Sequence, residues 1–581
     1  MSSQLYELHP IAKRSGRNDA RTEGQHAREA IVQGLMMDTP LLVGGILRHA
    51  ATVHGRTDIV ARTVAGAVHR YTYRDAYARC RRLSAALRSL GVASGDRVGT
   101  LAWNTHHHFE LFYGVPGIGA VLHTINPRLY DETITYIVNH AQDSWICIDA
   151  ATLALAERLA PALPSVRGWI YMDPASDLPK TSLTNVHAYE ALLAAASHEA
   201  EWPEFDERQA ATICYTSGTT GAPKGVVYTH RSLVLAALLM STADMIGVLR
   251  SGDSEAAMPI APLFHANGWF MPFTAPMNGQ KLVLPGRHFE AAALGELIDG
   301  EGVTAAAAVP TVWFGLADHW HGRGAGPASL RIALVAGSKA PRKLVDELAA
   351  LGIPVGQVWG MTEVAGLRST LPPGAATRPA EEQLVWRMRQ GRIGYGTELR
   401  LLDDDGAELP WDGEAAGHLE ARGPCVAAGY YKDAAPSTTG WLSTGDVARI
   451  FPDGSIDIVD RSKDVIKSGG EWISSVTVEN AALDHPAVLQ AAVIGVEHAR
   501  WQERPLLLAV LRPGMETQTS ADDILAHLRT RLASWWVPDA VSFVDELPMT
   551  ATGKVRKAEL RERYGRPPVA DGAPAQRAAL G

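Results

Sequence analysis

Alternation of short apolar runs with helical patterns is the feature that most constrains the fold of this chain. From about residue 40 to 390, runs such as GAVLHTI (119–125) and RIALVAG (331–337) precede amphipathic stretches such as DETITYIVNHA (131–141) and PRKLVDELAALG (341–352). Strands that alternate with helices in this way form parallel sheets covered by helices. We therefore predict an α/β fold with a large N-terminal domain of helix-covered β-sheets.

The chain has 581 residues, which is too many for a single hydrophobic core. Between about 391 and 459 the pattern changes to short segments broken by Gly and Asp, which indicates a smaller antiparallel, β-barrel-like unit. After DRSKD (460–464) a compact pattern resumes, typical of a small mobile α+β domain. The predicted organisation is a disordered tail at 1–37, a large domain at 38–459, a hinge at 460–464, a small C-terminal domain at 465–565 and a flexible tail at 566–581.

Composition argues against several classes of protein. The net charge is -9, with 54 basic and 63 acidic residues, so we expect no nucleic-acid partner. Residues 1–37 lack the apolar core of a signal peptide, and the long uncharged run 258–280 carries four prolines, which predicts a buried irregular wall rather than a membrane-spanning helix. The four cysteines are far apart and show no C-x-x-C spacing. We expect a cytoplasmic protein with no integral membrane segment.

The segment YTSGTTGAPKGVVYTH (215–230) has the composition of a phosphate-binding loop. Glycine allows backbone N–H groups to approach an anion, and Lys224 supplies positive charge. A Walker loop needs Gly-Lys followed by Ser or Thr and then by a helix, whereas Lys224 is followed by Gly225 and an apolar run. Both flanks are typical of strands. We therefore predict a β-loop-β phosphate clamp.

Three further segments follow in order: VWGMTE (358–363), STGD (443–446) and LPMTATGK (547–554). With residues 215–230, they make the chain resemble the adenylate-forming superfamily of acyl-CoA synthetases, luciferases and peptide-synthetase adenylation domains, from about residue 40 to 565. The resemblance implies that a carboxylate attacks the α-phosphate of ATP, and that a thiol then displaces AMP. It also implies Mg²⁺ as cofactor, ATP and CoA as co-substrates, and the homodimer that relatives commonly form.

The resemblance implies a role for each nucleotide-binding motif. Glu363 would bind Mg²⁺ with Thr216 as a second contact, because Mg²⁺ prefers hard oxygen ligands, and Thr362 would bond the α-phosphate. Trp359 would lie on the adenine, where many relatives carry tyrosine, and Asp446 would accept hydrogen bonds from the ribose hydroxyls. The full ATP/AMP-binding set is Thr216, Ser217, Gly218, Thr219, Thr220, Gly221, Lys224, Gly337, Ser338, Trp359, Gly360, Met361, Thr362, Asp446 and Arg461.

The resemblance also implies that the small domain serves two half-reactions. Lys554 matches the adenylation lysine, and Lys463 occupies the hinge about which the domain would rotate. Rotation would bring in a loop that forms the channel for CoA, made of Lys467, Ser468, Gly469, Gly470, Glu471 and Trp472. The predicted catalytic residues are Lys554, Glu363, Thr362 and His265.

An apolar slot for an apolar acyl tail is predicted from PLFHANGWFMPF (262–273) and VPTVWFGLADH (309–319). We expect it to be lined by His265, Asn267, Gly268, Trp269, Val312 and Trp313. Amino-acid adenylation is disfavoured, because no acid stands out in these stretches to pair a substrate ammonium.

More closely, the chain resembles bacterial medium- and long-chain fatty acyl-CoA synthetases and 3-methylthiopropionyl-CoA ligases, which share LHTINPRL (122–129), HxNxW (265–269) and DRSKDVIKSGGEWISS (460–475). It departs from them at Gly268, where we associate alanine with these relatives, and at Trp359. The predicted function is an ATP-dependent acid–CoA ligase for medium- or long-chain fatty acids or similar aliphatic carboxylates. The alternatives are a 3-methylthiopropionyl-CoA ligase, an acyl-AMP ligase that loads a carrier protein, and an inactive nucleotide-binding relative.

Overall fold

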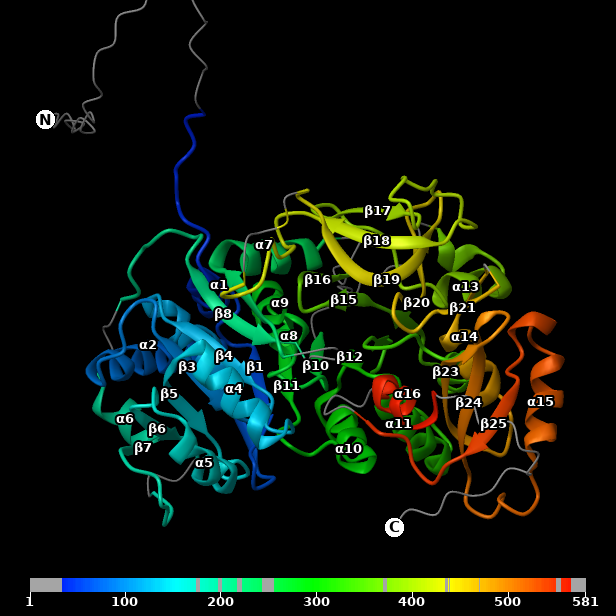
Figure 1. The fold of residues 1–581 in the computed structure, drawn as a ribbon. Coiled ribbons are helices and arrows are strands. Elements are labelled where there is room, and N and C mark those ends of the chain that lie inside the picture. Colours follow the sequence, from blue (N-terminus) through cyan, green and yellow to red (C-terminus); the bar gives the residue numbers. More distant parts are fainter. Residues whose placement is uncertain are drawn as a thin grey trace, which may run out of the picture. The chain divides into compact units, whose positions relative to one another are not determined.

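The structure is a computed structural model, and the chain from Pro40 onward forms one compact unit (Figure 1). The structure describes residues 34–173, 178–196, 201–216, 222–242, 255–368, 374–433, 437, 439–469, 471–549 and 555–565, without the side chains of 365–368, 376 and 471. Most of the predicted N-terminal tail and the predicted C-terminal tail therefore lie outside the described residues.

Two seven-stranded sheets form the large domain, as the alternating pattern predicted. In both sheets the pairing is parallel except at one edge, where β8–β9 and β1–β2 are antiparallel. The first sheet has the order β7 (Val186–Ala188), β6 (Gly168–Tyr171), β5 (Asp143–Ile148), β3 (Arg97–Leu101), β4 (Val121–Ile125), β8 (Ala210–Tyr215) and β9 (Gly225–Thr229). The second has the order β14 (Val355–Gln357), β13 (Ile332–Val335), β12 (Ala305–Ala308), β10 (Ala256–Pro259), β11 (Lys281–Leu284), β1 (Asp58–Arg62) and β2 (Val68–Thr72).

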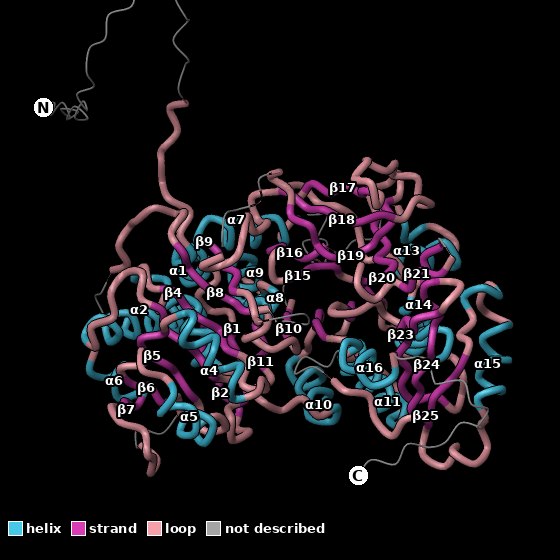
Figure 2. Tube along the Cα trace, viewed as in Figure 1, coloured by secondary structure: helices cyan, strands magenta, loops and turns pink. Residues whose placement is uncertain are grey.

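Helices pack against these sheets and bury their apolar faces (Figure 2). Central strands are buried on both faces, which is why β12 is an unbroken apolar run. The helices of this part are α1 (Val43–Val53), α2 (Tyr73–Ser89), α3 (His106–Gly114), α4 (Asp131–Ala141), α5 (Leu153–Leu159), α6 (Tyr189–Ala195), α7 (His230–Met240), α8 (Ala266–Trp269), α9 (Met271–Asn278), α10 (Ala291–Glu301), α11 (Pro310–Arg323), α12 (Arg342–Ala350) and α13 (Ala380–Arg387). Short 3₁₀ turns lie at Pro116–Ile118, Ala160–Ala162, Ala375–Thr377 and Ser534–Trp536.

The β-barrel-like unit predicted for 391–459 takes the form of a four-stranded antiparallel sheet in chain order. Its strands are β17 (Glu398–Leu402), β18 (Gly417–Arg422), β19 (Leu442–Ile450) and β20 (Ile456–Arg461). A hairpin of β15 (Trp359–Met361) and β16 (Val364–Arg368) precedes it, and Trp359 and Val364 belong to its hydrophobic core.

The chain after residue 465 builds a mixed sheet with its own hydrophobic core. The strands are β21 (Ile466–Ser468), β22 (Glu471–Ile473), β23 (Val488–His498), β24 (Gln502–Leu511) and β25 (Ala540–Phe543), and the helices are α14 (Ser475–Leu483), α15 (Ala521–Arg529) and α16 (Lys557–Tyr564). A separate core agrees with a separate domain, although the boundaries at 459 and 465 stay a prediction.

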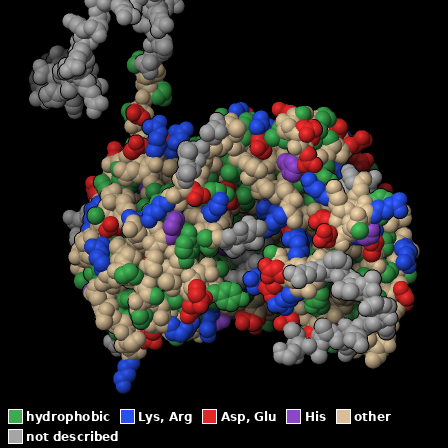
Figure 3. Space-filling view, viewed as in Figure 1, with side chains coloured by type: hydrophobic (Ala, Val, Ile, Leu, Met, Phe, Trp, Pro, Cys, Tyr) green, Lys and Arg blue, Asp and Glu red, His purple; other side chains and the backbone are tan. Residues whose placement is uncertain are grey.

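Acidic and basic side chains are interspersed on the face of the molecule drawn in Figure 3. Among the described residues, none of the helices combines the length and the apolar character needed to cross a membrane.

Candidate active site

The predicted phosphate clamp lies on the hairpin of β8 and β9, so the prediction of two flanking strands is confirmed. Tyr215 pairs with Gly225 at the end of the ladder. Beyond it, the Thr216 N–H donates to the carbonyl of Lys224 at 2.9 Å, and the Lys224 N–H donates to Thr216 Oγ1 at 3.2 Å. These bonds close the base of the loop. Residues Ser217, Gly218, Thr219, Thr220 and Gly221 lie outside the described residues.

Thr362 and Glu363 form the turn between β15 and β16, and both are buried. The Tyr228 hydroxyl, on β9, donates to the Thr362 carbonyl at 2.5 Å. The Tyr430 hydroxyl donates to Glu363 Oε1 at 2.7 Å. Burial raises the pKa of both tyrosines well above the usual value, so both phenols keep their protons. The phosphate hairpin, which is formed by β8 and β9, is therefore fixed to the turn that carries Glu363.

Glu363 fits the cation predicted for it. Its side chain is only 6% exposed, and among the described residues it has no ion pair with a lysine or arginine. Buried carboxylates are paired with cations or coordinate metals, because an isolated buried charge is costly. The described Tyr430 contact engages Oε1, and an ionised carboxylate oxygen is the ligand that Mg²⁺ prefers.

The three residues predicted to hold adenine and ribose are brought together by the strand register. Asp446 on β19 pairs directly with Arg461 on β20, and Arg461 Nε lies 2.9 Å from Asp446 Oδ1. The Trp359 indole Nε1 donates to Asp446 Oδ2 at 2.8 Å. Trp359 is 6% exposed and packs in the core of the four-stranded sheet β17–β20. Its indole N–H thus holds Asp446, a role additional to the predicted stacking on adenine.

Of the remaining residues predicted to bind the base, two lie at the carboxyl end of a parallel strand, where α/β folds bind ligands. Gly337 and Ser338 are exposed just after β13, and Gly337 has a φ of 88°. The Val358 N–H donates to the Val335 carbonyl at 2.9 Å, which places the start of β15 beside the end of β13. Gly360 and Met361 continue β15 towards Glu363.

The predicted acyl wall contains an unusual backbone segment. Five consecutive residues, Ala266 to Phe270, have positive φ values between 38° and 62°, so α8 is a left-handed turn. Asn267 is fully buried, where its side chain donates to Thr212 Oγ1 at 2.6 Å and accepts from Thr124 Oγ1 at 3.3 Å. A left-handed turn of non-glycine residues persists only where its surroundings hold it, and such strain clusters at functional sites.

Other residues of the predicted wall differ in their surroundings. His265 is half-buried at the start of the turn, and Trp269 is 5% exposed in a hydrophobic core to which strands of both sheets contribute. Trp313 is fully buried in a different core, where its indole N–H donates to the Leu334 carbonyl at 3.0 Å, and Val312 packs against that same core. The structure thus does not group Trp313 with Trp269, and its place in the acyl pocket stays a prediction.

For the run 258–280, the sequence predicts a buried, irregular wall. The run is largely buried as predicted, but Met271–Asn278 forms the helix α9, so the prediction of an irregular backbone is wrong for these residues. Pro272 falls in the first turn of α9, where its missing N–H removes no helical bond.

The predicted CoA loop packs against aromatic side chains of the C-terminal part. The Trp535 indole N–H donates to the carbonyl of the buried Ser468 at 3.3 Å, and Arg504 Nη1 donates to the Ser468 hydroxyl, also at 3.3 Å. The Gly469 N–H donates to the Trp501 carbonyl at 3.0 Å.

Other residues of the predicted CoA loop contact the four-stranded sheet and its loops. Lys467 Nζ lies 3.4 Å from Asp404 Oδ2, and the Trp472 ring contacts the His418 ring. Gly470 and Lys554 lie outside the described residues, as does the side chain of Glu471.

Lys463, the predicted hinge residue, precedes Asp464, which pairs with Arg561 of α16. Arg561 Nη2 also donates to the Lys463 carbonyl at 3.0 Å. Burial lowers the pKa of the Lys463 ammonium below its usual value.

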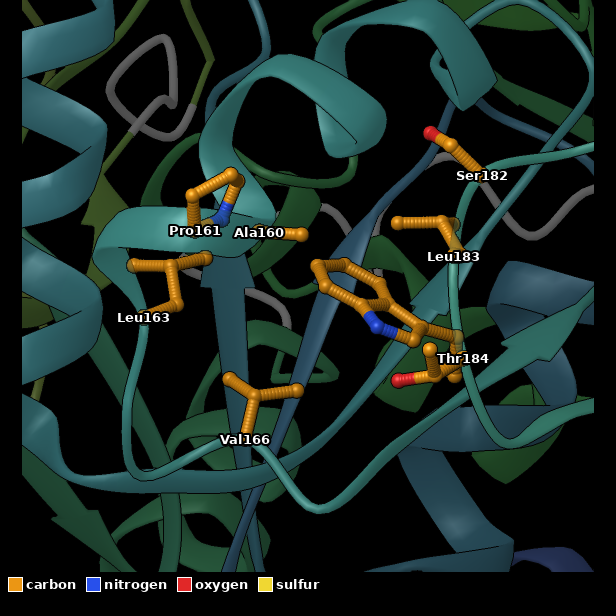
Figure 4. A pocket seen from close by; sticks show the side chains of 8 residues that line it. Ala160, Pro161, Leu163, Val166, Ser182, Leu183 and Thr184 are labelled. Atoms are coloured by element: carbon orange, nitrogen blue, oxygen red, sulfur yellow. The ribbon is translucent and has the colours of Figure 1, made fainter.

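A small pocket lies elsewhere, beside β6 at the far side of the first sheet (Figure 4). The strands β5, β3 and β4 separate it from the phosphate hairpin. It is lined by Ala160, Pro161, Leu163, Val166, Trp169, Ser182, Leu183 and Thr184, and it contains none of the predicted site residues.

Sequence reasoning missed Tyr228 and Tyr430, whose hydroxyls hold the turn at 362–363. Tyr228 stood within the quoted phosphate segment and Tyr430 within the short GYY run (429–431), but a tyrosine pattern alone does not indicate its partner.

The hairpin of β8 and β9, a buried carboxylate that pairs with no lysine or arginine among the described residues, and a Trp–Asp–Arg cluster agree with a nucleotide-binding enzyme of the adenylate-forming class. Family models agree: residues 47–431 match the AMP-binding enzyme family and residues 477–554 match the AMP-binding enzyme C-terminal domain. The chain therefore belongs to the AMP-binding enzyme family.

Named relatives and a solved structure point the same way. The chain is 43% identical to a 3-methylmercaptopropionyl-CoA ligase of Ruegeria lacuscaerulensis, covering 91% of this chain and 98% of the relative. It is 41% identical to a medium-chain-fatty-acid–CoA ligase of Ectopseudomonas oleovorans, covering 92% and 97%. The structure of an anthranilate CoA ligase in complex with anthranoyl-AMP superposes with a TM-score of 0.79 at 26% identity, covering 90% of this chain and 98% of that one. The predicted fold class and the prediction of an acid–thiol ligase are confirmed.

Proposed function

We propose that this protein converts medium- or long-chain fatty acids, or similar aliphatic carboxylates, to CoA thioesters through an acyl-AMP intermediate. The observation that carries this proposal is the buried Glu363, which the structure fixes to the phosphate hairpin without giving it a cationic partner among the described residues. Similarity to ligases of a fatty acid and of a thioether acid supports an aliphatic substrate.

In the proposed mechanism, the backbone amides of the phosphate loop and Lys224 hold the β- and γ-phosphates. Asp446 and Arg461 orient the ribose, and Trp359 the adenine. When bound at Glu363 and Thr216, Mg²⁺ would neutralise part of the charge that accumulates as the carboxylate approaches the α-phosphate. Thr362 donates to an α-phosphate oxygen, and Lys554 contacts both the carboxylate and that phosphate. His265 and the left-handed turn after it border the acyl group.

We further propose that the small domain rotates at Lys463 between the two half-reactions. After adenylation Lys554 would leave the site and the loop at 467–472 would enter it, so that the CoA thiol reaches the acyl carbonyl. A homodimer and a cytoplasmic location remain part of the proposal.

A panel of acids tests the substrate class. Purified protein is assayed for pyrophosphate release and thioester formation with straight-chain, branched, methylthio and aromatic acids, with and without CoA. We expect the highest kcat/KM for a medium- or long-chain acid. A preference for the methylthio acid would instead identify a 3-methylthiopropionyl-CoA ligase. Pyrophosphate release without any thioester would indicate a carrier-loading ligase, and no release with any acid would indicate an inactive relative.

A further inference from the structure

One segment of the chain contacts both the phosphate hairpin and the turn that carries Glu363. The Tyr431 N–H donates to the Gly225 carbonyl at 2.8 Å, directly after Lys224. The Ala427 N–H donates to the Glu363 carbonyl at 2.7 Å, and Val426 bridges to Val364. Residues 426–431 therefore join the two halves of the candidate ATP site through the backbone.

Tyr430, within this segment, also contacts two charged side chains of that site. Its hydroxyl donates to Glu363 Oε1 at 2.7 Å, and the Lys224 ammonium lies 4.6 Å from the centre of its ring. A cation at this distance is attracted to the ring face. The phenol thus contacts an anion through its hydroxyl and a cation through its ring.

We propose that Tyr430 is a positioning residue for the adenylation step, which rests on the function proposed above. Its hydroxyl holds the Glu363 carboxylate in the orientation that binds the metal ion. Its ring keeps Lys224 from forming a direct ion pair with Glu363, a pair that would withdraw both side chains from the nucleotide and the metal ion. The exposed Asp433, 3.7 Å from the Lys224 ammonium, offers this lysine only a weak alternative partner.

Two variants separate the hydroxyl from the ring. Tyr430→Phe keeps the ring and removes the hydrogen bond, whereas Tyr430→Ala removes both. We expect Tyr430→Phe to weaken metal binding about 10-fold or more, which is usual when the partner of a metal ligand is lost, and to leave nucleotide binding nearly unchanged. Tyr430→Ala should weaken both, because Lys224 then reaches Glu363.

The measurement uses Mn²⁺ as the probe, with its free concentration followed by electron paramagnetic resonance in the presence of α,β-methylene-ATP. Nucleotide affinity is measured separately by calorimetry. The control is Tyr395→Phe, the same chemical change at a side chain that is 89% exposed. Unchanged Mn²⁺ affinity in Tyr430→Phe would overturn the proposal, and so would equal losses of Mn²⁺ and nucleotide affinity in that variant.

A purely structural role makes a different prediction. It would lower the thermal midpoint of Tyr430→Phe and its kcat at every Mg²⁺ concentration alike. We expect instead that kcat approaches the wild-type value as Mg²⁺ is raised. Because Mn²⁺ binding requires no acid substrate, a wild-type protein that binds Mn²⁺ and nucleotide but forms no acyl-AMP would contradict the proposed function and not the role of Tyr430. Should Tyr430→Ala fail to fold, Tyr430→Phe decides the matter alone.

Discussion

At the scale of single residues, buried histidines determine how the fold responds to acid. His230 is fully buried at the start of α7, where its Nδ1 accepts a hydrogen bond from the Val43 N–H at 3.2 Å. His108 is buried in α3. Burial lowers the pKa of each imidazole to about 4. Their neutral forms are therefore part of the folded structure.

The first prediction concerns the pH dependence of stability. Since the folded pKa of His230 lies below the unfolded value of 6.5, the unfolded chain binds the extra proton first. The contribution is complete above pH 6.5 and is lost as pH falls towards 4, at up to about 1.4 kcal/mol per pH unit for one proton. His230→Asn, which keeps an acceptor for Val43, should reduce this slope in urea unfolding measured at several pH values. An unchanged slope would mean that His230 titrates alike in both states.

The second prediction concerns Trp359. Trp359→Phe removes the indole N–H that donates to Asp446 Oδ2 at 2.8 Å. A hydrogen bond to a charged acceptor contributes about 1.5–3 kcal/mol, so the KM for ATP should rise about 10-fold or more, with a smaller change in kcat. Steady-state kinetics compares it with Trp411→Phe, at a more exposed tryptophan in a loop. The two variants should differ; equal KM values for ATP would argue against Asp446 as the ribose-binding carboxylate.

At the scale of elements, the sequence predicted the strands better than the turns. Buried parallel strands such as β12 are short continuous apolar runs, and their length and flanking turn residues indicate them. The left-handed turn at 266–270 gives no periodic signal, and although Asn and Gly tolerate positive φ, Ala, Trp and Phe do not favour it. Nor does any local pattern give a register, so the pairing of Asp446 with Arg461 could be proposed only through the family resemblance.

The third prediction tests this turn. Gly268 has a φ of 62°, and a Cβ added there would lie 2.6 Å from Leu263 Cδ2. Gly268→Ala should therefore lower the free energy of unfolding by about 1–2 kcal/mol or more, given the cost of left-handed backbone for a residue with a Cβ. The control Gly322→Ala, in α11, meets nothing within 4 Å and should be neutral or slightly stabilising. If urea titrations gave Gly268→Ala and Gly322→Ala the same free energy of unfolding, the turn would adapt to the added Cβ without strain.

At the scale of the whole molecule, the predicted hinge is bonded to the C-terminal helices. Asp460 Oδ2 accepts a hydrogen bond from the Ser475 N–H at 2.6 Å, at the start of α14. Lys557, at the start of α16, lies 2.6 Å from Glu479 Oε1 and donates to Ser475 Oγ at 2.6 Å. Met549 pairs with Val555 through an isolated β-bridge, shortly before α16. A rotation at the hinge would therefore move α14 and α16 together.

The fourth prediction separates the half-reactions. Lys554→Ala should slow acyl-AMP formation by ~10²–10³, the usual loss for one electrostatic contact to a transition state. Supplied with ready-made acyl-AMP and CoA, the variant should still form thioester, because in the proposed cycle Lys554 would by then have left the site. Each half-reaction is followed separately, with the exposed Lys180→Ala as control. Equal slowing of both would rule out a rotating domain and require one fixed active site.

The most direct test of the account follows the oxygen atoms of the carboxylate. The protein is given ATP, CoA and a fatty acid whose carboxylate oxygens carry a heavy isotope, and the products are analysed by mass spectrometry. If the carboxylate attacks the α-phosphate, one heavy oxygen appears in AMP, and pyrophosphate is unlabelled. Formation of ADP with the label in inorganic phosphate would contradict the account, because the acid would then have attacked the γ-phosphate.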